Sequence, residues 1–212
     1  MRMSFDIHKR EEITMSLEFV LDYRSPYSYL ANTKVAELCP QATYQVVDII
    51  NVMKQVHNQP SPECPAKARY SAVDATRWAK LYKVAWAPNM AFLGAMRDKS
   101  FDGAVLSRAG LAAQELGVFS IANDALFTAV WAGTVDLLSA EGKAQFLAKH
   151  GIDVDIWAHA DSKVIRERLA SCDEHAAVRG VFGVPTFFVG DEMFFGNDRL
   201  DFVRAALKKL SK

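Results

Sequence analysis

The sequence predicts an α/β domain whose sheet is built from both ends of the chain and is interrupted by a long all-helical insertion. Three observations predict this fold class. A strand–helix–strand pattern occupies residues 17–50, helical patterns fill almost all of 66–179, and two short apolar runs with a final amphipathic segment follow at 185–210. Because one sheet needs strands from both ends, we expect no separable N-terminal domain.

The composition is that of an ordinary globular protein. Of 212 residues, 50% are hydrophobic and 24% are charged, and Lys plus Arg equal Asp plus Glu at 25 each. This balance favours neither nucleic acid nor an anionic membrane as a partner, and no apolar run approaches the ~20 residues that cross a bilayer. The three cysteines have neither zinc spacing nor the spacing of a redox pair. We expect idle thiols and a cytoplasmic protein.

The N-terminal part of the pattern is a βαβ unit. Apolar side chains alternate over residues 17–23 and predict a strand. Pro26 suits the first turn of a helix, which ends before Pro40. Residues 44–50 are rich in β-branched side chains and predict a second strand, and a polar, proline-bearing loop is expected at 51–65.

The rest of the chain is helical until a C-terminal ββα pattern. Gly190-Asp191 joins two β-prone runs as a hairpin turn, and Asn197-Asp198 suits the N-terminus of a last helix. The expected strands cover 185–189 and 192–195, and the clearest helices cover 70–82, 107–116, 123–131, 140–149 and 162–178.

The chain is therefore expected to divide into three parts. Residues 16–65 and 180–212 form the sheet-bearing domain, and residues 66–179 form the helical insertion. Residues 1–15 lack the apolar core of a secretory signal and are expected to be a flexible extension.

The order βαβ, helical block, ββα is typical of a thioredoxin-type domain, which carries Cys-x-x-Cys at the start of its first helix. Here Ser25 and Ser28 occupy the two sulfur positions. A hydroxyl cannot form a disulfide, which excludes thiol–disulfide exchange at this site. It can donate a hydrogen bond to a sulfur from another molecule. The sequence thus predicts a protein that borrows a thiol, and glutathione is the obvious donor.

Ser25 has a second interpretation, because serine commonly caps helices without doing chemistry. Lowering a thiol pKa from ~8.5 to ~6.5 requires roughly 2.7 kcal/mol. A hydrogen bond to a charged group supplies roughly 1.5–3 kcal/mol, and a helix N-terminus supplies about 0.3–1 kcal/mol. One hydroxyl and one helix end therefore suffice. Ser28 is expected to face the helix interior or a nearby backbone group.

Pro185 precedes the third strand, where thioredoxin-like folds have a cis proline that faces the active-site helix. A cis bond there would expose the backbone N–H and C=O of Val184, which could pair with the cysteinyl unit of glutathione as an added strand would. The alternative is a trans proline at the start of an edge strand.

Four further residues could hold the two ends of a bound peptide. Asn58 and Lys67 flank the proline-bearing loop and could hold a carboxylate, although solvated loop residues are the alternative. Asn197 and Asp198 are helix-capping residues by default, but they lie one hairpin from Pro185, and the Asp198 carboxylate could receive an ammonium group. No histidine has metal-binding spacing with Cys, Asp or Glu, so no metal is expected.

From about Ser16 to the C-terminus, the chain closely resembles 2-hydroxychromene-2-carboxylate isomerases. These belong with kappa-class glutathione transferases and DsbA-type oxidoreductases in the thioredoxin-like superfamily. The most specific segments are residues 22–32, 77–82 and 182–200. The Gly-Asn-Asp-Arg within the last segment resembles the isomerases more than the transferases.

The resemblance implies a fold, a reaction and a set of site residues. The fold is the DsbA and kappa-class arrangement, a thioredoxin-like domain with a helical insertion. The reaction interconverts 2-hydroxychromene-2-carboxylate and trans-o-hydroxybenzylidenepyruvate, a small aromatic keto acid, during breakdown of naphthalene-like aromatics, with glutathione as the nucleophilic cofactor. Ser25 would contact the sulfur, Val184 beside Pro185 the tripeptide backbone, Asn197 and Asp198 the γ-glutamyl end, and Asn58 and Lys67 the glycyl end.

Several alternatives stay open. Residues 86–90 follow the isomerase pattern only loosely, so the substrate could be a related conjugated keto acid. A kappa-like transferase or peroxidase would use the same thiolate, a DsbA-family protein without redox activity would keep only the fold, and a binding module would hold glutathione without turnover. A homodimer is compatible with the resemblance, since such proteins are often dimers.

Overall fold

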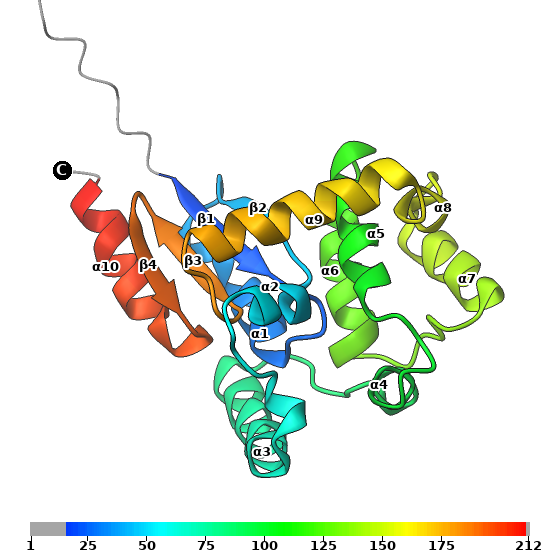
Figure 1. The fold of residues 1–212 in the computed structure, drawn as a ribbon, viewed down its shortest axis with the longest axis horizontal. Coiled ribbons are helices and arrows are strands. Elements are labelled where there is room, and N and C mark those ends of the chain that lie inside the picture. Colours follow the sequence, from blue (N-terminus) through cyan, green and yellow to red (C-terminus); the bar gives the residue numbers. More distant parts are fainter. Residues whose placement is uncertain (1–15, 211–212) are drawn as a thin grey trace, which may run out of the picture.

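The computed structural model describes residues 16–210, which form a mixed four-stranded sheet beside a group of helices (Figure 1). The strand order is β2-β1-β3-β4; β1 runs parallel to β2 and antiparallel to β3, and β3 pairs antiparallel with β4. The strands are β1 (Leu17–Leu21), β2 (Thr43–Val46), β3 (Thr186–Val189) and β4 (Glu192–Phe195). The extension expected at residues 1–15 lies outside the described residues.

Helices cover both faces of the sheet. Phe19 belongs to a core cluster that includes side chains of α1 (Pro26–Leu38) and α10 (Leu200–Leu210). Its neighbour Val20 belongs to a second cluster with side chains of α2 (Ile49–Gln55) and α9 (Lys163–Val178). Since successive side chains of a strand point to opposite faces, β1 is buried on both sides and is an interior strand of the sheet.

The remaining helices lie beside the sheet and below it (Figure 1). In that view α9 runs from the helical group back to the sheet, so it joins the two parts of the molecule. These elements are η1 (Ser61–Glu63), α3 (Pro65–Tyr82), α4 (Met90–Arg97), α5 (Ala104–Glu115), α6 (Phe119–Trp131), α7 (Ala140–His150), α8 (Ile156–Ala160) and η2 (Asn197–Arg199).

The expected α/β fold with a helical insertion is confirmed, and so is the first helix, which begins at Pro26 and has Cys39 as its C-cap. Gly190 has a φ of 58°, as the expected hairpin turn requires. The division into 16–65 with 180–212 and 66–179 stays a prediction. Among the helices of the described residues, none has the length and apolar character that crossing a membrane would require.

The expected second strand is wrong at its C-terminal end. The strand stops at Val46, and residues 49–55 form α2 instead of strand and loop. The cause is Asp48, whose carboxylate accepts hydrogen bonds from the backbone N–H groups of Ile50 at 3.0 Å and Asn51 at 3.4 Å. This cap begins a helix in a segment whose β-branched side chains favour a strand.

Candidate active site

Ser25 lies where the chain leaves β1 and begins α1. Its backbone is extended, and its Oγ accepts a hydrogen bond from the Ser28 N–H at 3.1 Å. The Ser25 N–H donates to the Asp22 carbonyl at 3.0 Å, which closes a tight turn before the helix. Pro26 has no backbone N–H, so at the first helical position it leaves no donor without an acceptor. Ser25 is therefore an N-cap, as one of the two interpretations expected.

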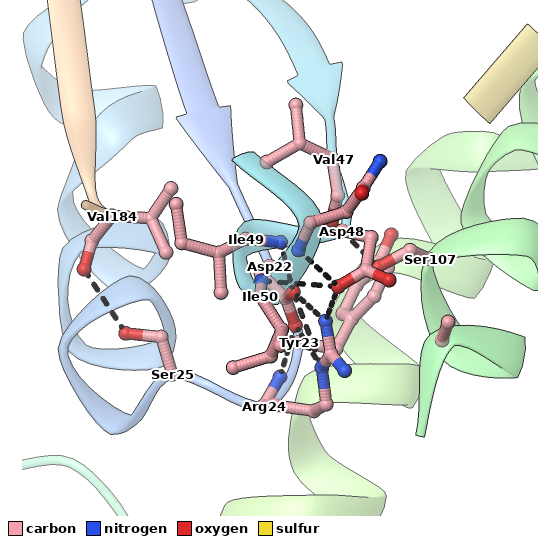
Figure 2. Close-up of polar contacts among 12 residues, drawn as sticks. Asp22, Tyr23, Arg24, Ser25, Val47, Asp48, Ile49, Ile50, Ser107 and Val184 are labelled. Carbon is pink, nitrogen blue, oxygen red and sulfur yellow. Dashed lines mark hydrogen bonds and ion pairs between the residues drawn. The ribbon is translucent and has the colours of Figure 1, made fainter. Parts of the chain in front are cut away.

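The same hydroxyl also faces the loop before β3. The Val184–Pro185 bond is cis, as expected, and Ser25 Oγ donates to the Val184 carbonyl at 3.2 Å (Figure 2). Within residues 16–210, no hydrogen bond engages the Val184 N–H. Gly183 allows this loop to approach β4, because a Cβ there would lie 2.6 Å from the Phe195 ring. The structure thus brings Ser25 and Val184 together across 159 residues of sequence.

An ion-pair network that the sequence did not predict holds the turn before Ser25 (Figure 2). Asp22 is fully buried, and its carboxylate accepts from the Arg24 N–H at 2.8 Å, the Ile49 N–H at 2.9 Å and the Arg24 guanidinium. The guanidinium also pairs with Asp48 at 2.5 Å. Burial lowers the pKa of Arg24, but the two carboxylates raise it above its usual value overall. The network therefore ties the turn to the start of α2.

A third carboxylate reaches this network from α9. The side chain of Asp173 accepts hydrogen bonds from the Asp48 N–H at 2.7 Å and from Asn51 Nδ2 at 2.8 Å. Burial is the main cause that raises the pKa of Asp173 to about 6, with further contributions from the charges of Asp48 and Asp22. The available signal was an acidic residue close to the C-terminal end of each of the first two strands, Asp22 and Asp48, since carboxyl ends of parallel strands meet at one edge of a sheet.

Asn197 and Asp198 lie beside the cis peptide. The Gly196 N–H donates to the Pro185 carbonyl at 2.9 Å, and η2 packs against α1. Asn197 is buried, its carbonyl accepts from the Tyr82 hydroxyl at 3.0 Å, and its side-chain Nδ2 has no partner among the described residues. Asp198 is exposed and lies 3.5 Å from the Arg199 guanidinium.

Asn58 and Lys67 are placed differently from this group. Asn58 Nδ2 donates to the Phe182 carbonyl at 2.7 Å and its Oδ1 accepts from the Gln59 N–H, so its amide already braces the loop before Pro185. Lys67 is exposed in the first turn of α3, and no ion pair joins it to another described residue. The structure therefore does not connect Lys67 to Ser25.

Ser28 is buried, as expected, but its Oγ has no hydrogen-bond partner in residues 16–210. A cavity of about 360 Å³ lies along β2, and another of about 420 Å³ lies on α3; neither is lined by Ser25 or by any other predicted site residue. In the described part of the chain, no cluster of three metal-ligating side chains occurs.

The fold and the site define a class of protein. A thioredoxin-like sheet, a helix that begins next to a cis proline, and hydroxyls in place of both cysteines make a thioredoxin-type protein without a dithiol centre. The family model of the DSBA-like thioredoxin domain matches residues 16–208.

Comparisons with known proteins identify the family. The chain is 31% identical to the 2-hydroxychromene-2-carboxylate isomerase of Pseudomonas putida, over 93% of this chain and 97% of that protein. A solved structure of a 2-hydroxychromene-2-carboxylate isomerase superposes with a TM-score of 0.76 at 28% identity, covering 93% of this chain and 96% of the other. The chain belongs to the DSBA-like family that includes the 2-hydroxychromene-2-carboxylate isomerases.

A third comparison concerns the fold alone. The cytosolic disulfide reductase DsbM from Pseudomonas aeruginosa, solved with GSH, superposes with a TM-score of 0.61 at 20% identity. The superposition covers 92% of this chain and 98% of DsbM.

Proposed function

We propose that this protein is a glutathione-dependent isomerase that interconverts 2-hydroxychromene-2-carboxylate and trans-o-hydroxybenzylidenepyruvate, or a related conjugated keto acid. The observation that carries the proposal is the Ser25 hydroxyl, which stands at the N-terminus of α1 and faces the Val184 carbonyl. The likeness to a curated isomerase along 93% of the chain supports the same activity.

Polar groups around Ser25 fit a bound tripeptide. The Val184 N–H and the Asn197 side-chain amide have no partner in residues 16–210, although Val184 is 8% and Asn197 only 4% exposed. A buried donor without an acceptor is unfavourable. A peptide carbonyl would satisfy the Val184 N–H, and a carboxylate would satisfy the Asn197 amide once this side chain turns out of its solvent-inaccessible position. Glutathione in the structure of DsbM, a protein of the same fold, agrees with this assignment.

When bound, glutathione would supply a thiolate nucleophile for a conjugated substrate. Ser25 has one hydroxyl proton, which it donates to the Val184 carbonyl. In the proposed site Ser25 turns this proton toward the sulfur, and the Val184 carbonyl becomes free to accept from a peptide N–H. The positive end of the α1 dipole favours negative charge at the same position.

The remaining predicted residues would hold the ends of the tripeptide. Asn197 and Asp198 would bind the γ-glutamyl end, with the Asp198 carboxylate facing the ammonium group. The Lys67 ammonium, which forms no ion pair within residues 16–210, would bind the glycyl carboxylate. Asn58 could bind the same carboxylate only if its amide gave up the hydrogen bond to the Phe182 carbonyl. A cytoplasmic location and a homodimer also remain predictions.

Conversion of 2-hydroxychromene-2-carboxylate by the purified protein tests the proposal. The product is followed by absorbance, and free thiol is titrated before and after the reaction. We expect turnover that depends on glutathione and leaves the total thiol unchanged. Loss of thiol in proportion to product would indicate a transferase instead. Conversion at the same rate without glutathione would remove the cofactor from the proposal. With glutathione present, no conversion of this substrate or of a panel of related conjugated keto acids would refute the isomerase.

A further inference from the structure

The strand β4 ends the sheet on one side, and its outer edge has free backbone groups. The Gly196 N–H donates to the Pro185 carbonyl at 2.9 Å, so these two residues occupy a hydrogen-bonded position of the ladder. Such positions alternate along an antiparallel pair. The N–H and C=O groups of Met193 and Phe195 therefore point away from β3, and no hydrogen bond within residues 16–210 engages them. This edge can accept one further strand.

One face of β4 is also apolar and exposed. Phe195 stands opposite Thr186, and Thr186 stands opposite Val20, whose side chain packs with α2 and α9. Phe195 and Met193 thus point to the α9 side of the sheet, where they are 41% and 38% exposed. The ring of Phe182 lies 4.6 Å from that of Phe195 and is 39% exposed. Natural proteins usually protect an apolar edge of this kind.

The chain has a segment of matching pattern before β1. Residues 1–8 alternate apolar and polar side chains, which is the pattern of a strand with one apolar face; the apolar members are Met1, Met3, Phe5 and Ile7. Neighbouring strands lie about 4.8 Å apart, so the position outside β4 is about 14 Å from β1. Residues 9–15 span up to roughly 23 Å when extended. The segment is therefore long enough to reach the free edge.

The direction of the added strand follows from the ends of the sheet. β1 begins at the end where Leu17 stands opposite Val189 and Val189 stands opposite Glu192. A strand antiparallel to β4 finishes beside Glu192, so residues 9–15 have only to cross this end of the sheet. A parallel strand would finish beside Phe195, and the connection would also have to return along the length of β4. The antiparallel direction therefore needs the shorter connection.

Charges on the two segments are complementary in this direction. Asp191 and Glu192 are exposed at the start of β4, and no ion pair joins either of them to another residue of 16–210. The cations Lys9 and Arg10 directly follow the alternating segment, so they reach this acidic end. The register that sets Asp6 opposite Glu192 is disfavoured, because like charges directly opposite each other are destabilising.

We propose that residues 1–8 add to β4 of the same molecule as a fifth, antiparallel strand, with Phe5 opposite Phe195 and Ile7 opposite Met193. The added strand covers the apolar face and binds the free backbone groups of the edge. With β4, β3 and β1 it makes a Greek key, in which residues 9–15 form the long connection. Part of the segment that the sequence analysis expected to be flexible is thereby ordered.

Amide hydrogen exchange of the full chain tests this strand. The amides of Met193 and Phe195 should exchange about 10-fold or more slowly in the wild type than in Phe5→Asp, which sets a charge against the apolar face. Ser4→Asp is the matched control, because it adds the same charge on the other side of the strand and should exchange as the wild type does. The Phe194 amide faces β3 and should be unchanged in all three proteins, which verifies that the sheet is intact.

Two results would overturn the proposal. Equal exchange of the Met193 and Phe195 amides in the wild type and in Phe5→Asp would show that residues 1–8 do not cover the edge. Protection that rises with protein concentration would assign the edge to a second copy of the chain. Neither glutathione nor substrate enters the measurement, so its outcome and that of the proposed isomerase are independent.

Discussion

Replacement of Ser25 by glycine isolates the hydroxyl from the helix cap. Ser25→Ala would remove both the proton that faces Val184 and the acceptor for the Ser28 N–H. Loss of an N-cap serine to alanine costs about 0.5–2 kcal/mol of stability, whereas glycine at the same position costs only a few tenths. Ser25→Gly therefore keeps α1 while it deletes the group proposed to meet the sulfur.

The expected magnitude follows from the single proton that Ser25 can donate. A hydrogen bond to a charged group contributes about 1.5–3 kcal/mol, which corresponds to a rise of about 1–2 units in the pKa of the bound thiol at 1.36 kcal/mol per unit. If the same hydrogen bond acts in the transition state, turnover falls by about 10–100-fold. The α1 dipole remains and keeps part of the effect.

The assay is an ultraviolet titration of the thiolate of bound glutathione, combined with turnover at saturating glutathione. Ser162→Ala is the matched control, because Ser162 caps α9 by accepting from the Ile165 N–H at 3.3 Å and lies outside the proposed site. The control should lose stability without a change in thiol pKa. Superimposable thiolate curves for the wild type and Ser25→Gly would refute the role of the hydroxyl.

Three other predictions concern the surroundings of Ser25. Arg24→Gln leaves the buried Asp22 without its counterion and should lower the free energy of unfolding in urea by about 3–5 kcal/mol; a change below about 1 kcal/mol would show that the network does not stabilise the turn. The pKa of Asp173 is raised to about 6, so the folded state holds a proton that the unfolded state has lost. Protonated Asp173 therefore stabilises the folded state fully below about pH 4, and this contribution to the free energy of unfolding is lost as the pH rises to about 6. In urea titrations, Asp173→Asn should flatten the dependence of the unfolding free energy on pH; parallel profiles for the variant and the wild type would contradict this. Asp198→Ala should weaken glutathione more than it slows turnover, because its proposed partner is remote from the sulfur, and calorimetry with unchanged affinity would exclude that role.

Local signals predicted the start of the site well. A strand followed by Ser25-Pro26 defines a capped helix within a few residues, and the observed α1 begins at Pro26. The cis bond before Pro185 was also expected, from its position before the third strand. The start of α1 depends on neighbouring residues, and the cis bond depends on the order of strands and helices along the chain. Both can therefore be predicted from the sequence.

Contacts between distant segments were not predictable in the same way. Asp48 was expected within a strand, yet it caps α2 and meets Arg24 and Asp173. Asn58 was assigned to a ligand carboxylate, but in the structure its amide bonds to the Phe182 carbonyl. Each of these contacts requires segments that only folding brings together.

The sequence by itself determined the α/β class, the helical insertion and the absence of a dithiol at the first helix, because hydrophobic periodicity and residue chemistry are local properties. Only the tertiary structure decided that the Ser25 hydroxyl donates its proton to the Val184 carbonyl, and that the buried Asp22 carboxylate ties the turn before Ser25 to the start of α2, where Asp48 and Asp173 of α9 meet. The reason is physical: hydrogen bonds and ion pairs depend on distances of about 3 Å, and chain order does not specify such distances between segments far apart in sequence.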